Sequence, residues 1–199
     1  KPYKFAPYLR TTIWGGYQIA PFKGIFTAQP NIGESWEISG VPGHESVVVE
    51  RGIIGDVDLG LNLTQLIDKY KGLLVGERVY RTYGNTFPLL VKFIDSRQDL
   101  SVQVHPDDQL AQKRHQCPGK TEMWYVLEAE EGAYLYYGFN RDITKEEFAE
   151  RIKNNTILEV LNKVNVKSGD VFFIDAGTVH AIGAGLMICE IQQNSNTTY

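Results

Sequence analysis

GDVFFIDAGTVH, residues 169–180, is the stretch of the chain that says most about its fold. Residues 171–174 form a short apolar run with the composition that buried β-strands have. Gly177 then allows a turn, and His180 follows it closely. Most single histidines are structural or exposed to solvent, but this one has a fixed place after a strand and a glycine turn. The segment therefore predicts a strand that delivers a histidine to a defined position.

The spacing of this segment resembles the second sequence motif of the cupins. That motif has a glycine, five residues, a position that is usually proline, one residue, a second glycine, two residues and a histidine. Gly169, Gly177 and His180 match it. Asp175 stands at the usual proline position, and Ala184 stands where an asparagine is often found. The resemblance implies a cupin β-barrel.

Short strands are also predicted on both sides of this segment from their apolar and β-branched residues. They cover residues 46–50, 87–94, 100–105, 122–127, 133–137 and 186–192, and a turn at 130–132 is expected to pair two of them. Helices are expected over 63–74, over 107–114 with an aspartate cap, and over 144–154 with Thr144 as the cap. Many short strands interrupted by helices predict a mainly β fold, a double-stranded β-helix or jelly-roll barrel with helical insertions.

Length and charge limit the possible functions. The chain of 199 residues suits one domain, expected to span residues 1–199, and its net charge of −4 argues against a nucleic-acid or anionic-membrane partner. No apolar run is long enough to suggest a membrane span. Cys117 and Cys189 are the two cysteines, and no CxxC motif occurs. A disulfide framework is therefore not expected, and a cytoplasmic location fits best.

A row of polar residues follows one face of the strand predicted over 100–105. Alternate residues of a strand share a face, so Ser101, Gln103 and His105 would point one way and the intervening valines the other. The row could face a cavity. It could equally be the exposed polar face that antiparallel strands commonly have.

Glu122 and Lys120 share a face of another predicted strand. Glu122 could bind a metal ion, or it could pair with Lys120 at the surface. Two histidines, a glutamate and a glutamine would offer the nitrogen and oxygen ligands that zinc accepts. With a single carboxylate, such a site would keep a formal charge of about +1 and could polarise a substrate oxygen.

Lys92 interrupts the apolar run at 89–94. A lysine buried among such neighbours is costly unless an anion pairs with it. Alternatively, Lys92 could lie on an edge strand and extend to water. Together with Ser101 and Lys120 it would form a plausible phosphate pocket, because two ammonium groups and a hydroxyl donor suit a phosphate.

Six motifs in chain order resemble a known family over nearly the whole chain. They are WGG (14–16), GESWEIS (33–39), QVHPDD (103–108), GKTEMWY (119–125), GTVHA (177–181) and EIQQNS (190–195). Together they look like a type I mannose-6-phosphate isomerase of the short bacterial kind. Members of that family are metal-dependent cupins that interconvert mannose 6-phosphate and fructose 6-phosphate.

The resemblance implies roles for individual residues. Gln103, His105, Glu122 and His180 match the zinc ligands of the family, so one zinc ion per chain is expected. Lys92, Ser101 and Lys120 match positions on the phosphate side of the pocket. The implied reaction moves a proton between C2 and C1 through a cis-enediol, with Lys120, Glu190 and a metal-bound water as candidates for the transfer. The implied partner is a small sugar phosphate; the resemblance predicts no oligomeric state.

Three departures from the family pattern affect these expectations. The family's catalytic arginine directly follows the residue that matches Tyr199, and in many members an aspartate matches Asn196. A further C-terminal β domain of the family is expected to be absent or truncated. The polypeptide ending at Tyr199 is accordingly expected to be a poor catalyst. Two alternatives stay open, a non-catalytic phosphosugar-binding cupin and an iron-dependent cupin oxygenase.

Overall fold

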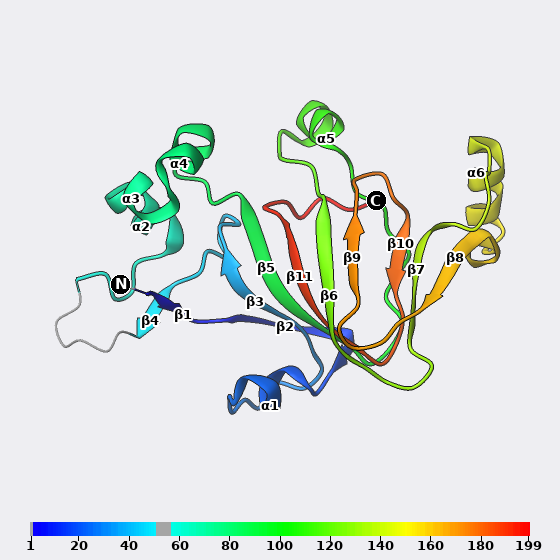
Figure 1. The fold of residues 1–199 in the computed structure, drawn as a ribbon, viewed down its shortest axis with the longest axis horizontal. Helices are drawn as coiled ribbons and strands as arrows, with labels where there is room; N and C mark the ends of the chain where they lie inside the picture. Colours follow the sequence, from blue (N-terminus) through cyan, green and yellow to red (C-terminus); the bar gives the residue numbers. More distant parts are fainter. Residues whose placement is uncertain (1, 51–56) are drawn as a thin grey trace.

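The computed structural model describes residues 2–50 and 57–199 (Figure 1). Its main feature is a six-stranded antiparallel sheet that faces a three-stranded one. In spatial order the larger sheet contains β2 (Tyr8–Gly16), β3 (Ile32–Ser39), β5 (Leu89–Ser96), β11 (Leu186–Gln193), β6 (Glu122–Ala129) and β9 (Val171–Ile174). The smaller sheet contains β10 (His180–Ile182), β7 (Tyr134–Phe139) and β8 (Leu161–Asn165).

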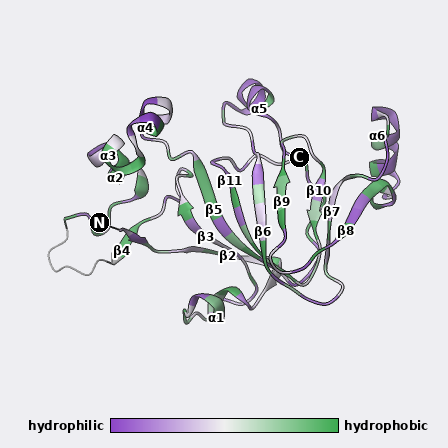
Figure 2. Ribbon diagram, viewed as in Figure 1, coloured by the Kyte–Doolittle hydropathy of each residue, from purple (hydrophilic) through white to green (hydrophobic). Residues whose placement is uncertain are grey.

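The hydrophobic core lies between these two sheets. Apolar side chains from both sheets meet in one buried cluster that includes Val126, Leu135, Ile174, Ile182 and Ile188. Each comes from a different strand, so the cluster joins β6, β9 and β11 to β7 and β10. Figure 2 shows hydrophobic residues along β5 and β9, whereas α5 and α6, outside the barrel, are largely hydrophilic.

Helices occupy the connections between strands. They are α1 (Ile19–Lys23), α2 (Leu63–Tyr70), α3 (Gly72–Val75), α4 (Glu77–Tyr83), α5 (Asp108–His115), α6 (Lys145–Lys153) and the short 3₁₀ helix η1 (Ile157–Val160). Two further strands, β1 (Lys4–Phe5) and β4 (Val48–Glu50), form a small separate sheet. No helix within the described ranges is long and apolar enough to cross a bilayer.

Most of the predicted elements are present. The strands expected over 46–50, 87–94, 122–127, 133–137, 171–174 and 186–192 appear as β4, β5, β6, β7, β9 and β11. Asp107 caps α5, where it accepts a hydrogen bond from the backbone of Leu110, and Thr144 caps α6 in the same way. The two cysteines are free thiols, as expected.

Three predictions about local structure are wrong. The helix expected over 63–74 is broken, because Lys71 adopts φ 49° between α2 and α3. Residues 100–105 form no ladder strand: Leu100 bonds to Ile182, Gln103 forms an isolated bridge with His180, and Val104 bonds to Tyr199. With its hydrogen bonds divided among separate partners, this extended segment belongs to neither sheet.

The third correction concerns β6 and β7, which follow one another but do not pair. Both edges of β6 are already occupied, by β11 and β9, and β7 lies between β10 and β8. The turn at 130–132 instead carries the chain from one sheet to the other. Stacking the two strands lets Val126 and Leu135 join the same core cluster. A hairpin would have left these two side chains in one sheet.

Candidate active site

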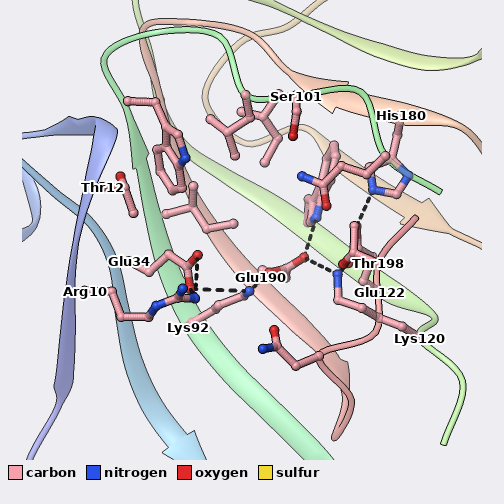
Figure 3. A pocket seen from close by; sticks show the side chains of 17 residues that line it. Arg10, Thr12, Glu34, Lys92, Ser101, Lys120, Glu122, His180, Glu190 and Thr198 are labelled. Carbon is pink, nitrogen blue, oxygen red and sulfur yellow. Dashed lines mark hydrogen bonds and ion pairs between the residues drawn. The ribbon is translucent and has the colours of Figure 1, made fainter. Parts of the chain in front are cut away.

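A pocket of about 280 Å³ opens on the inner side of the larger sheet (Figure 3). Its walls are side chains of β2, β3, β5, β6 and β11, together with residues of the extended segment 100–103, of β10 and of the C-terminal segment 196–198. Every residue predicted for the site lines this pocket or touches a residue that does.

His105, Glu122 and His180 form a compact cluster at one end of the pocket. All three are buried, and each offers a ligand atom within 4.8 Å of the other two. Nε2 of His180 lies 3.2 Å from Oε1 of Glu122, and Nε2 of His105 lies 3.6 Å from Oε2. The residues come from the segment before α5, the first residue of β6 and the first residue of β10. The fold thus brings together three distant motifs.

Backbone carbonyls orient both imidazoles. Nδ1 of His105 lies 3.1 Å from the carbonyl oxygen of Thr197, and Nδ1 of His180 lies 2.8 Å from that of Thr178. A carbonyl oxygen only accepts, so each Nδ1 carries a proton and a neutral ring has its lone pair on Nε2. Burial, reinforced by the charge of Lys120, lowers the pKa of His105 to about 3, so this ring is neutral at physiological pH.

The residues of this cluster fit a divalent metal ion. Oε1 of Glu122 is buried, accepts no hydrogen bond from residues 2–50 and 57–199, and faces Nε2 of His180. Because Nδ1 of His180 is held by the carbonyl of Thr178, Nε2 is the nitrogen left to face this oxygen, and a cation between the two atoms would be bound by both. Neutral imidazole nitrogen and carboxylate oxygen are ordinary zinc ligands. Lys120 contacts Nε2 of His105 and Oε2 of Glu122, so an ion bound here would compete with its ammonium group.

Gln103 lies beside this cluster through its backbone. Gln103 and His180 exchange two backbone hydrogen bonds of 2.9 Å, and the Gln103 side chain lines the pocket. The alternation predicted for Ser101, Gln103 and His105 is not strict, because the adjacent residue Leu100 lines the pocket as well and His105 does not. Ser101 lines the same pocket. In Figure 3 it lies well away from Lys92.

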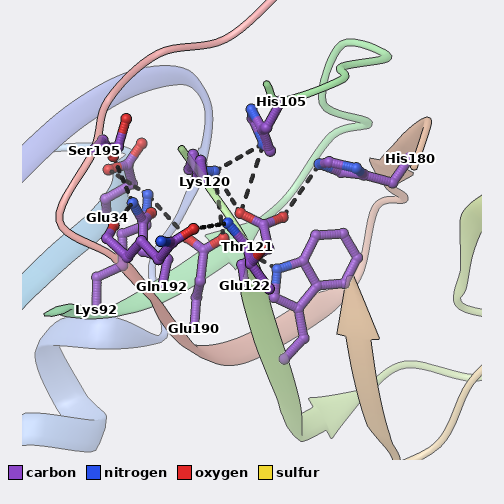
Figure 4. A network of polar contacts seen from close by, with 12 residues as sticks. Glu34, Lys92, His105, Lys120, Thr121, Glu122, His180, Glu190, Gln192 and Ser195 are labelled. Atoms are coloured by element: carbon purple, nitrogen blue, oxygen red, sulfur yellow. Dashed lines mark hydrogen bonds and ion pairs between the residues drawn. The ribbon is translucent and has the colours of Figure 1, made fainter. Parts of the chain in front are cut away.

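Buried charges of alternating sign cross the floor of the pocket (Figure 4). Nζ of Lys92 lies 2.8 Å from Oε2 of Glu190 and 3.7 Å from Oε2 of Glu34. Nζ of Lys120 contacts Glu122 and lies 3.8 Å from Oε1 of Glu190. At the far end, Nη1 of Arg10 lies 3.1 Å from Glu34. The order along the floor is Arg10, Glu34, Lys92, Glu190, Lys120 and Glu122.

These neighbours decide the ionisation of the buried groups. Burial alone would raise the pKa of Glu190, but the charges of Lys92 and Lys120 hold that pKa well below its usual range. Burial would lower the pKa of Lys92, yet the charges of Glu190 and Glu34 outweigh it and raise the pKa. For Glu122, burial and the charge of Glu190 raise the pKa. Glu190 is thus a carboxylate and Lys92 an ammonium ion at neutral pH.

Of the two alternatives for Lys92, the edge-strand lysine is wrong. β5 lies between β3 and β11, and Lys92 is 7% exposed. The anion that compensates its burial is supplied by the chain itself, from Glu190 and Glu34. Glu122 also does not pair with Lys120 at the surface, because both residues are buried.

The sequence interpretation missed the wall formed by β2 and β3. Arg10, Thr12 and Trp14 alternate along β2 and line the pocket, and Glu34 of β3 does too. The spacing of these three residues could have indicated that they line one surface, since alternate residues of a strand share a face. It is weak because polar residues on a strand usually mark the solvent side.

Comparisons with known proteins agree with this geometry. The family model described as "Phosphomannose isomerase type I, catalytic domain" matches residues 3–136. The chain is 39% identical over its whole length to the mannose-6-phosphate isomerase ManA of Bacillus subtilis (strain 168) and covers 60% of that protein. It is 40% identical to the mannose-6-phosphate isomerase of Streptococcus mutans, over 94% of this chain and 56% of that protein.

A crystal structure of the mannose 6-phosphate isomerase from Bacillus subtilis has the same fold. It superposes with a TM-score of 0.88 and 32% sequence identity, over 100% of this chain and 60% of the other. The predicted cupin barrel is thereby confirmed. The chain spans about three fifths of the length of these relatives. The family match and the full-length identity together show that the chain belongs to the type I phosphomannose isomerases.

Proposed function

We propose that this protein is a zinc-dependent aldose–ketose isomerase that interconverts mannose 6-phosphate and fructose 6-phosphate. The observation that carries the proposal is the buried His105, Glu122 and His180 cluster at the end of a pocket that also contains Lys92 and Lys120. Relatives named mannose-6-phosphate isomerases suggest the substrate. The two free cysteines are consistent with a reducing cytoplasm as the place of action.

The proposed ligands of one zinc ion are His105, Glu122 and His180, with the side-chain oxygen of Gln103 as a fourth donor. Support comes from the two imidazoles whose Nδ1 atoms are held by carbonyls and from the unpartnered Oε1 of Glu122. Zinc bound there would act as a Lewis acid on substrate oxygens. The backbone bridge between Gln103 and His180 keeps these two residues together.

Of the three residues predicted for the phosphate, we propose Lys92 alone for that side, because Lys120 contacts Glu122 of the metal cluster and Ser101 lies well away from Lys92 (Figure 3). Both lysines already pair with carboxylates, so a phosphate would compete with Glu190 and Glu34 for Lys92 and with Glu122 for Lys120. Lysine ammonium groups bind phosphate as point charges. The buried carboxylates that pair with the two lysines therefore weaken the affinity of these lysines for a phosphate.

The reaction needs a proton to leave C2 of the aldose, forming a cis-enediol, and a proton to be delivered to C1. Lys120 and Glu190 are the proposed proton-transfer residues. The lowered pKa of Glu190 keeps it ionised but also makes it a weak base. The ammonium group of Lys120 can donate a hydrogen bond to the enediolate oxygen, where charge develops. We therefore propose that the Glu190 carboxylate, although a weak base, takes the proton from C2 and returns it to C1. The Lys120 ammonium group would give a proton to O1 and regain one from O2.

The experiment is a conversion assay in D₂O. Mannose 6-phosphate should yield fructose 6-phosphate, and NMR should detect deuterium at the transferred position, because a proton held by a side chain exchanges with solvent. The cupin oxygenase alternative predicts oxygen consumption instead, and the non-catalytic alternative predicts binding without turnover. Either of those results in the zinc-loaded protein would overturn the proposal.

A further inference from the structure

Arg10 holds a position at the pocket that no motif pointed to. It lies on β2 and lines the pocket, and its side chain is 38% exposed. The guanidinium carbon lies 5.5 Å from the ring centroid of Trp36. Nη1 donates hydrogen bonds of 3.2 and 3.1 Å to the two carboxylate oxygens of Glu34. Ring and carboxylate together fix the orientation of the guanidinium group.

Much of the hydrogen-bonding capacity of Arg10 is unused. A guanidinium group has five N–H donors. Among residues 2–50 and 57–199, only Nη1 of Arg10 makes a hydrogen bond, so Nε and Nη2 retain their donors. By contrast, the side chains of Lys92 and Lys120 are 9% and 6% exposed, and both pair with buried carboxylates. Arg10 is therefore the pocket cation that combines access from solvent with free donors.

The position of Arg10 also suits the polarity of the proposed substrate. Figure 3 shows Arg10 and His180 at opposite ends of the pocket, with Lys92 and Glu190 between them. A hexose 6-phosphate has its reacting carbons at C1 and C2 and its phosphate at the other end of the chain. If the reacting end meets the His105, Glu122 and His180 cluster, the phosphate extends toward Arg10.

We propose that Arg10 binds the phosphate of the substrate and that Glu34 positions Arg10 for this contact. The inference rests on the proposed function for its choice of a hexose phosphate. The planar guanidinium group matches two phosphate oxygens at once, which an ammonium group cannot do. Glu34 uses Nη1 and leaves the remaining donors for the ligand. Arg10 thereby selects phosphorylated sugars over neutral ones.

The test compares wild-type protein with Arg10→Gln and with an arginine control. Calorimetry measures the binding of glucitol 6-phosphate, a hexitol phosphate that cannot isomerise, and kinetics measure KM and kcat for mannose 6-phosphate. Arg10→Gln should raise Kd and KM about ten- to a hundredfold, with a much smaller change in kcat. Arg97 is the matched control, because it also lies over an aromatic ring, that of Tyr17 at 5.3 Å, but it does not line the pocket. Arg97→Gln should leave Kd and KM unchanged.

A second variant guards against misfolding, because Arg10→Gln leaves Glu34 with fewer partners. Glu34→Gln combined with Arg10→Gln removes both charges and should show the same loss of binding. Wild-type Kd and KM in a folded variant would overturn the inference while leaving the isomerase intact. If wild-type protein binds glucitol 6-phosphate through Arg10 but does not isomerise mannose 6-phosphate, the proposed function fails and the inference stands.

Discussion

Replacing Lys92 by methionine should destabilise the protein strongly, although it removes a charge from the interior. Methionine keeps the length and much of the bulk of lysine. It leaves Glu190 without the ammonium group 2.8 Å away, and Glu34 without the one at 3.7 Å. From sequence alone, the opposite result would be expected, because Lys92 would then be an uncompensated charge in an apolar strand. The ion pairs reverse that expectation.

The size of the effect follows from burial. Removing one partner of a buried ion pair costs about 3–5 kcal/mol, since the other charge stays in a poorly solvated place. Glu190 keeps a hydrogen bond of 3.1 Å from Trp124 and the charge of Lys120 at 3.8 Å, which favours the lower end of this range. For a domain of this size, the loss corresponds to a fall in melting temperature of about 6–20 °C.

Urea unfolding followed by circular dichroism measures this loss, with Lys113→Met as the control. Lys113 is exposed on α5, so its replacement should change stability by no more than about 0.5 kcal/mol. Adding Glu190→Gln to Lys92→Met should recover part of the loss, because no uncompensated carboxylate remains at that position. Unchanged or raised stability in Lys92→Met would refute the reasoning.

The loss should also depend on pH. The paired lysines lower the pKa of Glu190 in the folded protein. The ionised carboxylate therefore stabilises the folded state at pH values above the pKa that Glu190 has in the unfolded chain, and this stabilisation is lost as the pH falls through the folded-state pKa. Without Lys92 that pKa rises. The difference between wild-type protein and Lys92→Met should therefore be largest near neutral pH and smaller under acidic conditions.

Two further predictions concern other parts of the barrel. Gly33→Ala would place a Cβ 2.1 Å from Oγ1 of Thr12 in the pocket wall, so it should lower the free energy of unfolding by about 1–3 kcal/mol and raise KM. In Gly40→Ala the nearest atom to the new Cβ is 3.1 Å away, so the same unfolding assay should show a smaller loss. Burial raises the pKa of Asp95 despite its hydrogen bond of 2.6 Å from the backbone of Gln18. Wild-type protein should therefore gain stability relative to Asp95→Asn as pH falls through that pKa. The absence of this slope would show that Asp95 is ionised without penalty.

The parts of the fold that could be predicted are those where local pattern and final environment agree. β9 and β11 are apolar runs that are partly or largely buried in the sheet, and composition alone identified them. Asp107 and Thr144 precede helices that they cap through hydrogen bonds within the same turn. His180 follows a strand and a turn whose spacing is local. Such features need no knowledge of distant residues.

The features that could not be predicted depend on contacts between distant parts of the chain. Lys92 is compensated by Glu190 and Glu34, which no local pattern connects to it. β2 and β3 were missed because their polar residues face a pocket, whereas polar positions on a strand usually indicate solvent. The segment 100–105 has the composition of a strand, but three separate partners divide its hydrogen bonds.

The dependence of isomerase activity on the bound metal is tested most directly by measuring metal content and turnover in the same protein samples. Metal-free protein is titrated with zinc while bound metal and the conversion of mannose 6-phosphate are measured together, for wild-type protein and for His180→Ala. We expect one tightly bound zinc ion per chain, with turnover rising in proportion to bound zinc, and loss of both in His180→Ala. Isomerisation that continues in protein stripped of metal by a chelator would show that the reaction does not depend on this site.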